Sequence, residues 1–401
     1  MRTPSRRNLL TGALGGLLGG TVLGKPATAH AGSPAAPVPT TPHPRWITSW
    51  AAAHTAPTPT DLDATTGFTN TTIHNTIHLS AGTAPGRTAS AQLRLRFANP
   101  FGSAPLLLGP VTVAGADQPV AAASATTSRR LLFGGDEQVV LAAGATVVSD
   151  PVDLAVPDGG DLVVSMYLPG PTGPVSFHRN VHATGLIGDR PTKSVFLLSG
   201  VDVLANGRQT LAVLGDSITE GVGTPDDANL RWPDQYAARF RHRPAVANLG
   251  TSGNRLLLDD ARFGPSGQAR FDRDVLALPG LQAVLVFLGI NDIQQPPSQT
   301  DPARLLAGYE QLARRARDHN LNVLGATIGP FKGWIRYTEP LDQIRHQVND
   351  VLRSGRIFDR IVDVDAVLRD PADPAQLRPA FNSGDGLHPN AAGAKAIALS
   401  V

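Results

Sequence analysis

The chain has 401 residues, of which 41% are hydrophobic, enough to bury the cores of about two domains. It contains no cysteine, which excludes disulfide frameworks, thiolate zinc sites, cysteine nucleophiles and lipid attachment through cysteine. The formal net charge of +2 becomes −2 when four basic residues near the N-terminus are set aside, because no acidic residue precedes Asp61. The four are Arg2, Arg6, Arg7 and Lys25. The remaining chain is nearly neutral, so its charge gives no support to nucleic-acid binding.

The first residues combine paired arginines, Arg6 and Arg7, with a Leu- and Gly-rich stretch from Leu9 to Leu23. Glycines interrupt this stretch, which makes it too weakly apolar for a stable membrane span. Small residues then offer cleavage sites at 27–29 and 29–31. This order resembles a twin-arginine signal peptide over residues 1–31, and a basic N-terminal tail is the alternative. We therefore expect export by the twin-arginine machinery and a secreted, extracellular bacterial protein.

The region from 32 to 207 lacks a helical hydrophobic period. Residues 32–45 are rich in Ala, Pro and Thr and are expected to form a flexible linker. From 46 to 207, short runs such as 91–97 and 161–167 alternate between apolar and polar residues, with Gly, Pro, Asn and Asp between them. This pattern predicts an antiparallel, all-β sandwich domain of jelly-roll type. No segment after the leader reaches 18 uninterrupted apolar residues, so we expect no membrane span.

From residue 208 to 401 apolar runs alternate with amphipathic segments. This alternation predicts a doubly wound α/β domain with a parallel sheet covered on both faces. Asp301 stands where the N-cap of a helix is expected. The expected strands are 211–214, 245–249, 281–288, 321–328 and 361–364, and the expected helices are 233–241, 302–319, 341–352 and one from about 390.

Polar residues follow the predicted strands at their carboxyl ends, the edge where sites form in open parallel sheets. They include a serine, a histidine and an aspartate, the side chains that acyl transfer requires. The hydroxyl of Ser217 is a weak nucleophile and needs a base, which His388 can supply. Asp385, three residues earlier on a tight turn, can accept from Nδ1 of His388 and leave Nε2 facing the serine. Ser217 could instead cap the first helix of this region.

The oxyanion of a tetrahedral intermediate needs fixed hydrogen-bond donors. The backbone N–H groups of Ser217 and Gly253 and the side-chain amide of Asn291 can converge from three neighbouring strand ends. Gly253 could also be a plain turn glycine and Asn291 a turn former. Asp216 is expected to bond loop amides rather than to transfer protons.

These segments resemble the four conserved blocks of the SGNH hydrolases, also called GDSL esterases and lipases. Gly215-Asp216-Ser217-Ile218 is similar to the nucleophile block, with Ile218 where leucine names the motif. The other blocks fall on Gly253, on Asn291 within 289–292, and on Asp385 with His388. The resemblance implies a three-layer α/β/α fold with a five-stranded parallel sheet and hydrolysis without a metal or other cofactor. Residues 46–207 resemble the β-rich domain that precedes the catalytic domain in some exported members.

The sequence therefore predicts a secreted serine esterase acting on a small-molecule, lipid or polysaccharide ester. A carbohydrate acetylesterase would use the same residues, with the β-rich domain facing the sugar. A lipase or lysophospholipase would need an apolar groove. Only 5% of the residues are aromatic, which gives no indication of such a groove. A catalytically silent binding protein is a further alternative, against which the complete set of Ser, His, Asp and Asn speaks.

Several other residues carry alternative interpretations. Trp232 and Trp334 could line a substrate pocket or pack at its rim. His178 and His182 are four residues apart and could bind a metal if helical, although their surroundings are typical of strand and loop. Two acidic pairs, Asp226 with Asp227 and Asp370 with Asp373, could bind calcium or be solvated loop charges.

Overall fold

The computed structural model describes residues 44–83, 91–116, 128–240 and 242–401. The predicted leader and nearly all of the predicted linker lie outside these residues. The described residues belong to a single compact unit of the chain. It contains a β-rich region up to Ala205 and an α/β region from Thr210. None of the described helices has the length and apolarity to cross a bilayer.

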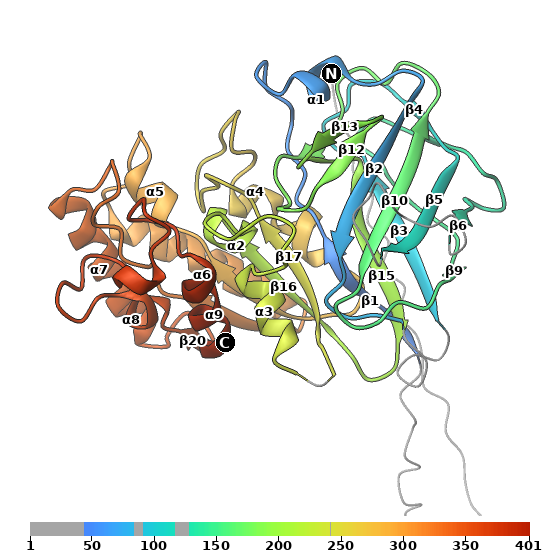
Figure 1. The fold of residues 1–401 in the computed structure, drawn as a ribbon. Helices are drawn as coiled ribbons and strands as arrows, with labels where there is room; N and C mark the ends of the chain where they lie inside the picture. The colour runs from blue at the N-terminus through green and yellow to red at the C-terminus, as the bar shows by residue number, and fades with distance from the viewer. Residues whose placement is uncertain (1–43, 84–90, 117–127, 241) are drawn as a thin grey trace, which may run out of the picture. The chain divides into compact units, whose positions relative to one another are not determined.

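In the described β-rich region, the strands form two larger antiparallel sheets, in the orders β1-β15-β3-β8, with β9 beside β3, and β13-β12-β2-β10-β5-β6 (Figure 1). Two short pairs, β4-β7 and β11-β14, complete them. The bounds are β1 Arg45–Ala51, β2 Thr71–His78, β3 Gln92–Ala98, β4 Leu106–Leu108, β5 Val111–Ala116, β6 Arg129–Leu131, β7 Val139–Leu141, β8 Thr146–Val148, β9 Val152–Asp153, β10 Asp161–Leu168, β11 Phe177–His178, β12 Gly185–Ile187, β13 Arg190–Thr192, β14 Val195–Phe196 and β15 Leu198–Ala205.

Alternating burial explains why these segments are strands. In β3 the side chains of Leu93, Leu95 and Phe97 are all buried in one core, while the residues between them are partly exposed. In β10, Leu162 and Val164 enter the same core. Such alternation suits a sheet with one buried face, and it confirms the strands predicted at 91–97 and 161–167. A short helix, α1 (Leu62–Thr66), lies in this region although no helix was expected there.

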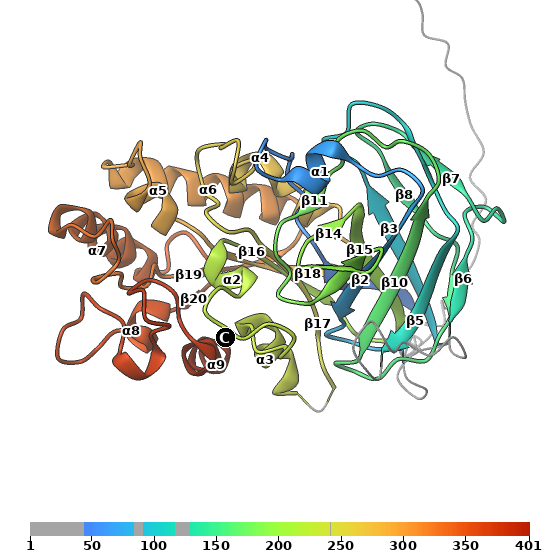
Figure 2. The ribbon, with the colours of Figure 1, turned by 45° about the horizontal axis from the view of Figure 1, so that its top comes forward.

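The α/β region contains a parallel sheet whose described strands are ordered β17-β16-β18-β19-β20. Helices cover both faces, as Figure 2 shows. This arrangement confirms the predicted α/β/α fold class with a five-stranded parallel sheet. The strands are β16 Thr210–Gly215, β17 Ala245–Gly250, β18 Leu281–Phe287, β19 Asn322–Ala326 and β20 Arg360–Val362; the helices are α2 Ser217–Glu220, α3 Trp232–Ala238, α4 Gly267–Phe271, α5 Ile290–Gln294, α6 Pro302–Asp318, α7 Glu339–Arg353, α8 Val364–Leu368 and α9 Ala391–Ser400, with a π-helical turn Asp272–Leu276 and a 3-10 turn Pro379–Phe381.

Successive residues of the central strands supply two separate cores. In β16, Leu214 joins a core with side chains of α4, α6 and α7, whereas Val213 joins a core with side chains of α3, α8 and α9. In β18, Val286 and Leu285 divide in the same way. Because both faces are buried, these strands are apolar runs without alternation, which is why they could be recognised in the sequence.

The β-rich region covers the edge of the parallel sheet at β17, against which β1 packs. The backbone N–H of Val246 in β17 donates to Ser80 Oγ at 2.8 Å. Close by, the N–H of Thr48 donates to Thr210 Oγ1 at 2.9 Å. The first of these bonds satisfies a backbone group at the β17 edge, which would otherwise be open to further pairing, and the second joins β1 to β16.

Candidate active site

The strand ends of the α/β region bring the candidate residues together. β16 ends at Gly215, directly before α2, which begins with Ser217. β17 ends at Gly250, three residues before Gly253, and α5, which follows β18, contains Asn291. Because β17, β16 and β18 are adjacent and parallel, these residues all leave the same edge of the sheet.

Asp216, not Ser217, caps the helix that carries the serine. The Oδ1 atom of Asp216 accepts from the N–H of Ile218 at 3.0 Å. Ser217 is then the first residue of α2, and its hydroxyl is not used for capping. The alternative interpretation of Ser217 as an N-cap is therefore wrong. Asp216 does bond a backbone amide, but that amide belongs to α2 and not to a loop as expected.

Ser217, His388 and Asp385 form a continuous chain of hydrogen bonds. Ser217 Oγ lies 2.9 Å from His388 Nε2, and His388 Nδ1 lies 2.6 Å from Asp385 Oδ2. Since a carboxylate only accepts, Nδ1 carries the proton and Nε2 is free to accept from the serine hydroxyl. The other oxygen of Asp385 accepts from the N–H groups of Leu387 and His388, both at 2.9 Å.

These bonds determine the charge of Asp385. Partial burial would raise the pKa of this carboxyl, but the hydrogen bonds from the ring and backbone of His388 and from Leu387 outweigh burial and hold the pKa well below its usual range. Asp385 is therefore ionised while it accepts the hydrogen bond from the ring of His388.

Gly386 lies between Asp385 and His388 and has a φ of +81°. A side chain at this position would meet backbone atoms of Gly333 and Trp334 within 2.6 Å, so the turn requires glycine here.

The candidate oxyanion donors are available in the structure. In the described part of the chain, no acceptor is bonded to the backbone N–H of Ser217 or of Gly253. Gly253 has a φ of +74°, and a Cβ atom there would lie 2.3 Å from the ring of Phe263. Its conformation therefore requires glycine.

The side-chain amide of Asn291 is oriented by three neighbours. Its Oδ1 accepts from Gln294 Nε2 at 2.8 Å and from Gln295 Nε2 at 2.9 Å, while its Nδ2 donates one hydrogen to the carbonyl of Asn254 at 3.1 Å. These contacts establish which atom is nitrogen and leave the second N–H for another acceptor. Gln294 and Gln295 were not among the residues chosen from the sequence, although their spacing from Asn291 along a helix was a usable signal.

The two tryptophans behave differently. The ring of Trp334 meets the ring of His388 edge-on, with centroids 5.7 Å apart, and its Nε1 donates to Gln294 at 3.1 Å. Trp334 thus connects the histidine to the group that orients Asn291. Trp232 is only 1% exposed, lies in the core of α3, α8 and α9, and donates to Thr219. The expectation that Trp232 lines a substrate pocket is therefore wrong, because its side chain is enclosed in that core.

Two buried carboxyls, Asp216 and Asp292, are the sequence neighbours of Ser217 and Asn291. Burial raises the pKa of Asp216 to about 7, against the effect of the bond from Ile218. Burial likewise raises the pKa of Asp292 to about 6, although it accepts from the N–H groups of Leu256 at 2.7 Å and Leu257 at 2.9 Å. Asp292 thereby joins α5 to the chain that follows Gly253.

The candidate metal residues have protein partners. His178 is in β11 and faces Glu220, whereas His182, with a φ of +54°, bonds to Asp226, so the two are not on one helix. The acids of the two candidate calcium pairs accept from backbone or side-chain donors, among them Lys193, Thr184, Ala372 and Lys332. Within the described residues, no group of three or more His, Asp or Glu is arranged to hold a metal ion.

With this geometry established, comparison with known proteins places the chain. Residues 213–396 match the GDSL-like Lipase/Acylhydrolase family. The match spans nearly all of the α/β region, and the protein is an ester hydrolase. Its substrates are thus of the ester class on which the family acts.

Solved structures resemble about half of the chain. One is a GDSL-like lipase from Bacteroides thetaiotaomicron, with 17% identity and a TM-score of 0.37, covering 48% of this chain and 84% of its own. Another is the M. smegmatis aryl esterase, with 18% identity, a TM-score of 0.40, and 48% and 95% coverage. A third is a carbohydrate acetylesterase from Sinorhizobium meliloti, with 16% identity, a TM-score of 0.38, and 48% and 95% coverage. No curated protein matches the sequence.

Proposed function

We propose that the protein is a serine esterase that hydrolyses carboxylic esters through Ser217, His388 and Asp385. The observation that carries the proposal is the hydrogen-bonded chain from Ser217 Oγ to His388 Nε2, at 2.9 Å, and from Nδ1 to Asp385, at 2.6 Å. Both distances are within the range required of a nucleophile and its base. The series of hydrogen bonds ends on the carboxylate of Asp385, which orients the ring of the base, His388.

In the proposed reaction, Ser217 Oγ attacks the ester carbonyl carbon while His388 Nε2 takes the hydroxyl proton. The tetrahedral intermediate collapses, the bond to the alcohol oxygen breaks, and His388 returns the proton to the leaving alcohol. Water then attacks the acyl-serine with His388 as base, releasing the acid and regenerating the hydroxyl. Asp385 remains ionised throughout and stabilises the ring while it is charged.

In this proposal, three hydrogen-bond donors stabilise the negative charge that develops on the carbonyl oxygen. These are the N–H groups of Ser217 and Gly253 and the second N–H of Asn291. They act most strongly when charge develops on the oxygen, so they stabilise the transition state more than the bound ester. The bonds that orient Asn291 allow it to do so without reorganising.

The test begins with Ser217→Ala, His388→Ala and the double variant. Each single change should abolish ester turnover in folded protein, and the double variant should be scarcely worse than either, because the residues act as a unit. Retained turnover, or losses that add, would contradict the assignment. Circular dichroism checks folding, and a serine-reactive phosphonate should label the wild type but not Ser217→Ala.

The substrate class is decided with p-nitrophenyl esters from acetate to palmitate, assayed beside acetylated polysaccharides. We expect turnover of simple carboxylic esters. Preference for acetylated polysaccharide would identify a carbohydrate acetylesterase, and preference for long acyl chains a lipase or lysophospholipase. If no ester is turned over in a Ser217-dependent way, the alternative of a catalytically silent binding protein would be favoured.

We also propose that residues 1–31 are a twin-arginine signal and that the enzyme is secreted by a bacterium. The sequence order of paired arginines, apolar stretch and small residues supports this. The exported chain should begin between His30 and Gly32, which N-terminal sequencing would measure. Undiminished export of the Arg6→Lys, Arg7→Lys variant would indicate the general secretory route instead.

A further inference from the structure

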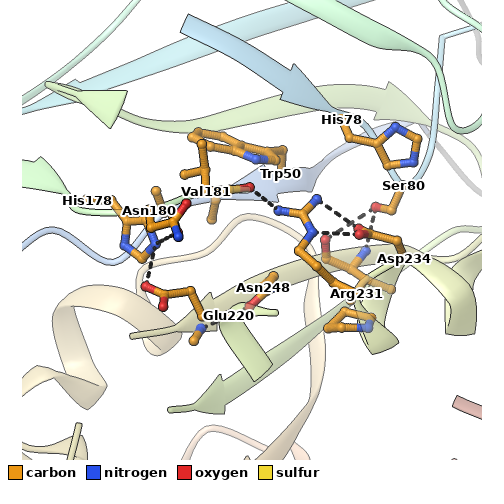
Figure 3. A pocket seen from close by; sticks show the side chains of 15 residues that line it. Trp50, His78, Ser80, His178, Asn180, Val181, Glu220, Arg231, Asp234 and Asn248 are labelled. Atoms are coloured by element: carbon orange, nitrogen blue, oxygen red, sulfur yellow. Dashed lines mark hydrogen bonds and ion pairs between the residues drawn. The ribbon is translucent and has the colours of Figure 1, made fainter. Parts of the chain in front are cut away.

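A polar hollow lies behind α2, between the β-rich region and the parallel sheet. Figure 3 shows its lining, with His178, Asn180 and Glu220 grouped on one side and Arg231 with Asp234 on the other. Its volume of about 20 Å³ leaves room for about one water molecule and for no ester substrate. The charged groups around it therefore serve one another rather than a ligand.

Glu220 is the residue in this hollow with a direct connection to the nucleophile. It is the last residue of α2, one turn after Ser217, and only 3% of it is exposed. An unpaired buried carboxylate would be strongly unfavourable, so its partners matter. His178 Nε2 lies 3.2 Å from its Oε1, and Ser252 Oγ donates to its Oε2.

Both ring nitrogens of His178 face oxygen atoms. Its Nδ1 lies 2.9 Å from the carbonyl of Ala53, and its Nε2 lies 3.1 Å from the carbonyl of Asn180 as well as close to Glu220. Every one of these partners is an acceptor, and the ring forms a hydrogen bond with Glu220. Burial alone would raise the pKa of Glu220, but the hydrogen bonds from His178 and Ser252 reverse this and bring it below its usual value.

Glu220 connects two segments of the proposed site. Its helix begins with Ser217, and Ser252, which donates to it, precedes the oxyanion candidate Gly253. The segments touch closely, because a Cβ atom on Gly250 would lie 2.2 Å from the backbone nitrogen of Glu220. A shift of the Glu220 carboxylate would therefore move the nucleophile relative to a donor.

We propose that His178 of the β-rich region is a positioning residue for ester hydrolysis, acting through Glu220 to hold the helix of Ser217 against the loop of Gly253. This inference rests on the proposed function of Ser217 and Gly253. It gives the β-rich region a part in catalysis: the region supplies the hydrogen-bond partner that the buried carboxylate at the end of α2 requires. Displacements of about 1 Å near reacting atoms can lower rates by about 10²-fold, so loss of this pair should be visible in kcat.

The experiment compares His178→Phe, His178→Gln and Glu220→Gln with the wild type. His178→Phe should lower kcat at least about tenfold with KM little changed, and should slow phosphonate labelling of Ser217 similarly. His178→Gln, which keeps a donor directed at Glu220, should recover part of the loss. Glu220→Gln keeps the side-chain size and should lower kcat, and adding His178→Phe to it should cost little more.

The matched control is Asp158→Asn. Arg208 donates to Asp158 at 2.9 and 2.8 Å, which joins the β-rich region to the segment before β16, away from α2. This variant should lower the melting temperature and keep the wild-type kcat. All rates are taken per phosphonate-titrated site, so partly folded variants remain measurable, and Glu220→Gln supplies the test if His178→Phe does not fold.

Two results would overturn the inference. One is wild-type kcat in both His178→Phe and Glu220→Gln, and the other is an equal fall of kcat in Asp158→Asn, which would indicate a general effect of loosening the two regions. Failure of the proposed function looks different, since the wild type itself would then lack Ser217-dependent turnover.

Discussion

Asn291 shows how much the behaviour of a candidate catalytic side chain depends on its neighbours. The sequence places it after an apolar strand, where a turn former and an oxyanion donor are equally acceptable. In the structure its amide is held by Gln294, Gln295 and the carbonyl of Asn254, and it is 2% exposed. A residue that merely turned the chain would not need its amide nitrogen directed this way.

We therefore predict that Asn291→Ala lowers kcat by about 10²–10³-fold, the usual loss for one oxyanion donor. KM should change little, because the bond strengthens only as charge develops. Asn291→Asp should be at least as damaging, since it places a carboxylate near the developing oxyanion. Steady-state kinetics measured beside thermal melts decide the matter: wild-type kcat with a lowered melting temperature would make Asn291 only a structural residue.

At the scale of elements, the predictions succeeded for strands and long helices, whose hydrophobic pattern is regular and whose ends have clear capping residues. Asp301 caps α6 as expected, since its Oδ1 accepts from the N–H of Ala303 at 3.0 Å. Asn390 likewise caps α9, accepting from Ala392 and Gly393 at 3.0 Å. The predicted strands and the long helices lie within a few residues of their observed bounds.

The elements that the sequence did not predict are short or contain buried charge. The short helix α4 contains Arg270, which is 2% exposed. Arg270 donates to the carbonyls of Gly215 and Leu249 at the ends of two strands, both at 2.9 Å. α7 was predicted even though it contains the fully buried Arg345, which pairs with Asp342 and Asp365. A charged residue on an inward face breaks the apolar pattern by which amphipathic helices are recognised.

Over the whole molecule, buried carboxyls make stability depend on pH. Asp216, with its pKa raised to about 7, keeps its proton in the folded state at pH values where the unfolded chain has released it. The folded state then binds more protons, so this group's contribution to the free energy of unfolding falls as pH rises from about 4 to about 7. Asp292, raised to about 6, acts in the same sense, whereas His54, lowered to about 3 by burial, acts in the opposite sense.

Because these contributions overlap, the prediction concerns a difference between two proteins. Asp216→Asn keeps an acceptor for Ile218 and removes the titration, so its melting temperature should rise relative to that of the wild type as pH goes from 4 to 8. Melts across that range measure the difference. A difference that does not change with pH would mean that Asp216 titrates alike in the folded and unfolded chain.

The sequence by itself determined the parallel sheet, the antiparallel strands before it, and the identity of Ser217, Asn291, Asp385 and His388 as candidates. It could do so because a strand buried on both faces is an apolar run, and because polar residues directly after parallel strands, such as Ser217, must share one edge. Asp385 and His388 were recognised by their resemblance to a known sequence block. Such information is local in the chain or follows from simple topology.

Only the tertiary structure decided which of those side chains meet, and with what support. Trp334 lies beside His388, 54 positions away, and His178 pairs with Glu220, 42 positions away. The core that encloses Trp232 takes side chains from α8 and α9, more distant still along the chain. Their partners are selected by packing between segments, and packing depends on shapes and distances that no local pattern of residues encodes. The proposed role of the β-rich region also depends on packing, because it rests on the buried contact between His178 and Glu220.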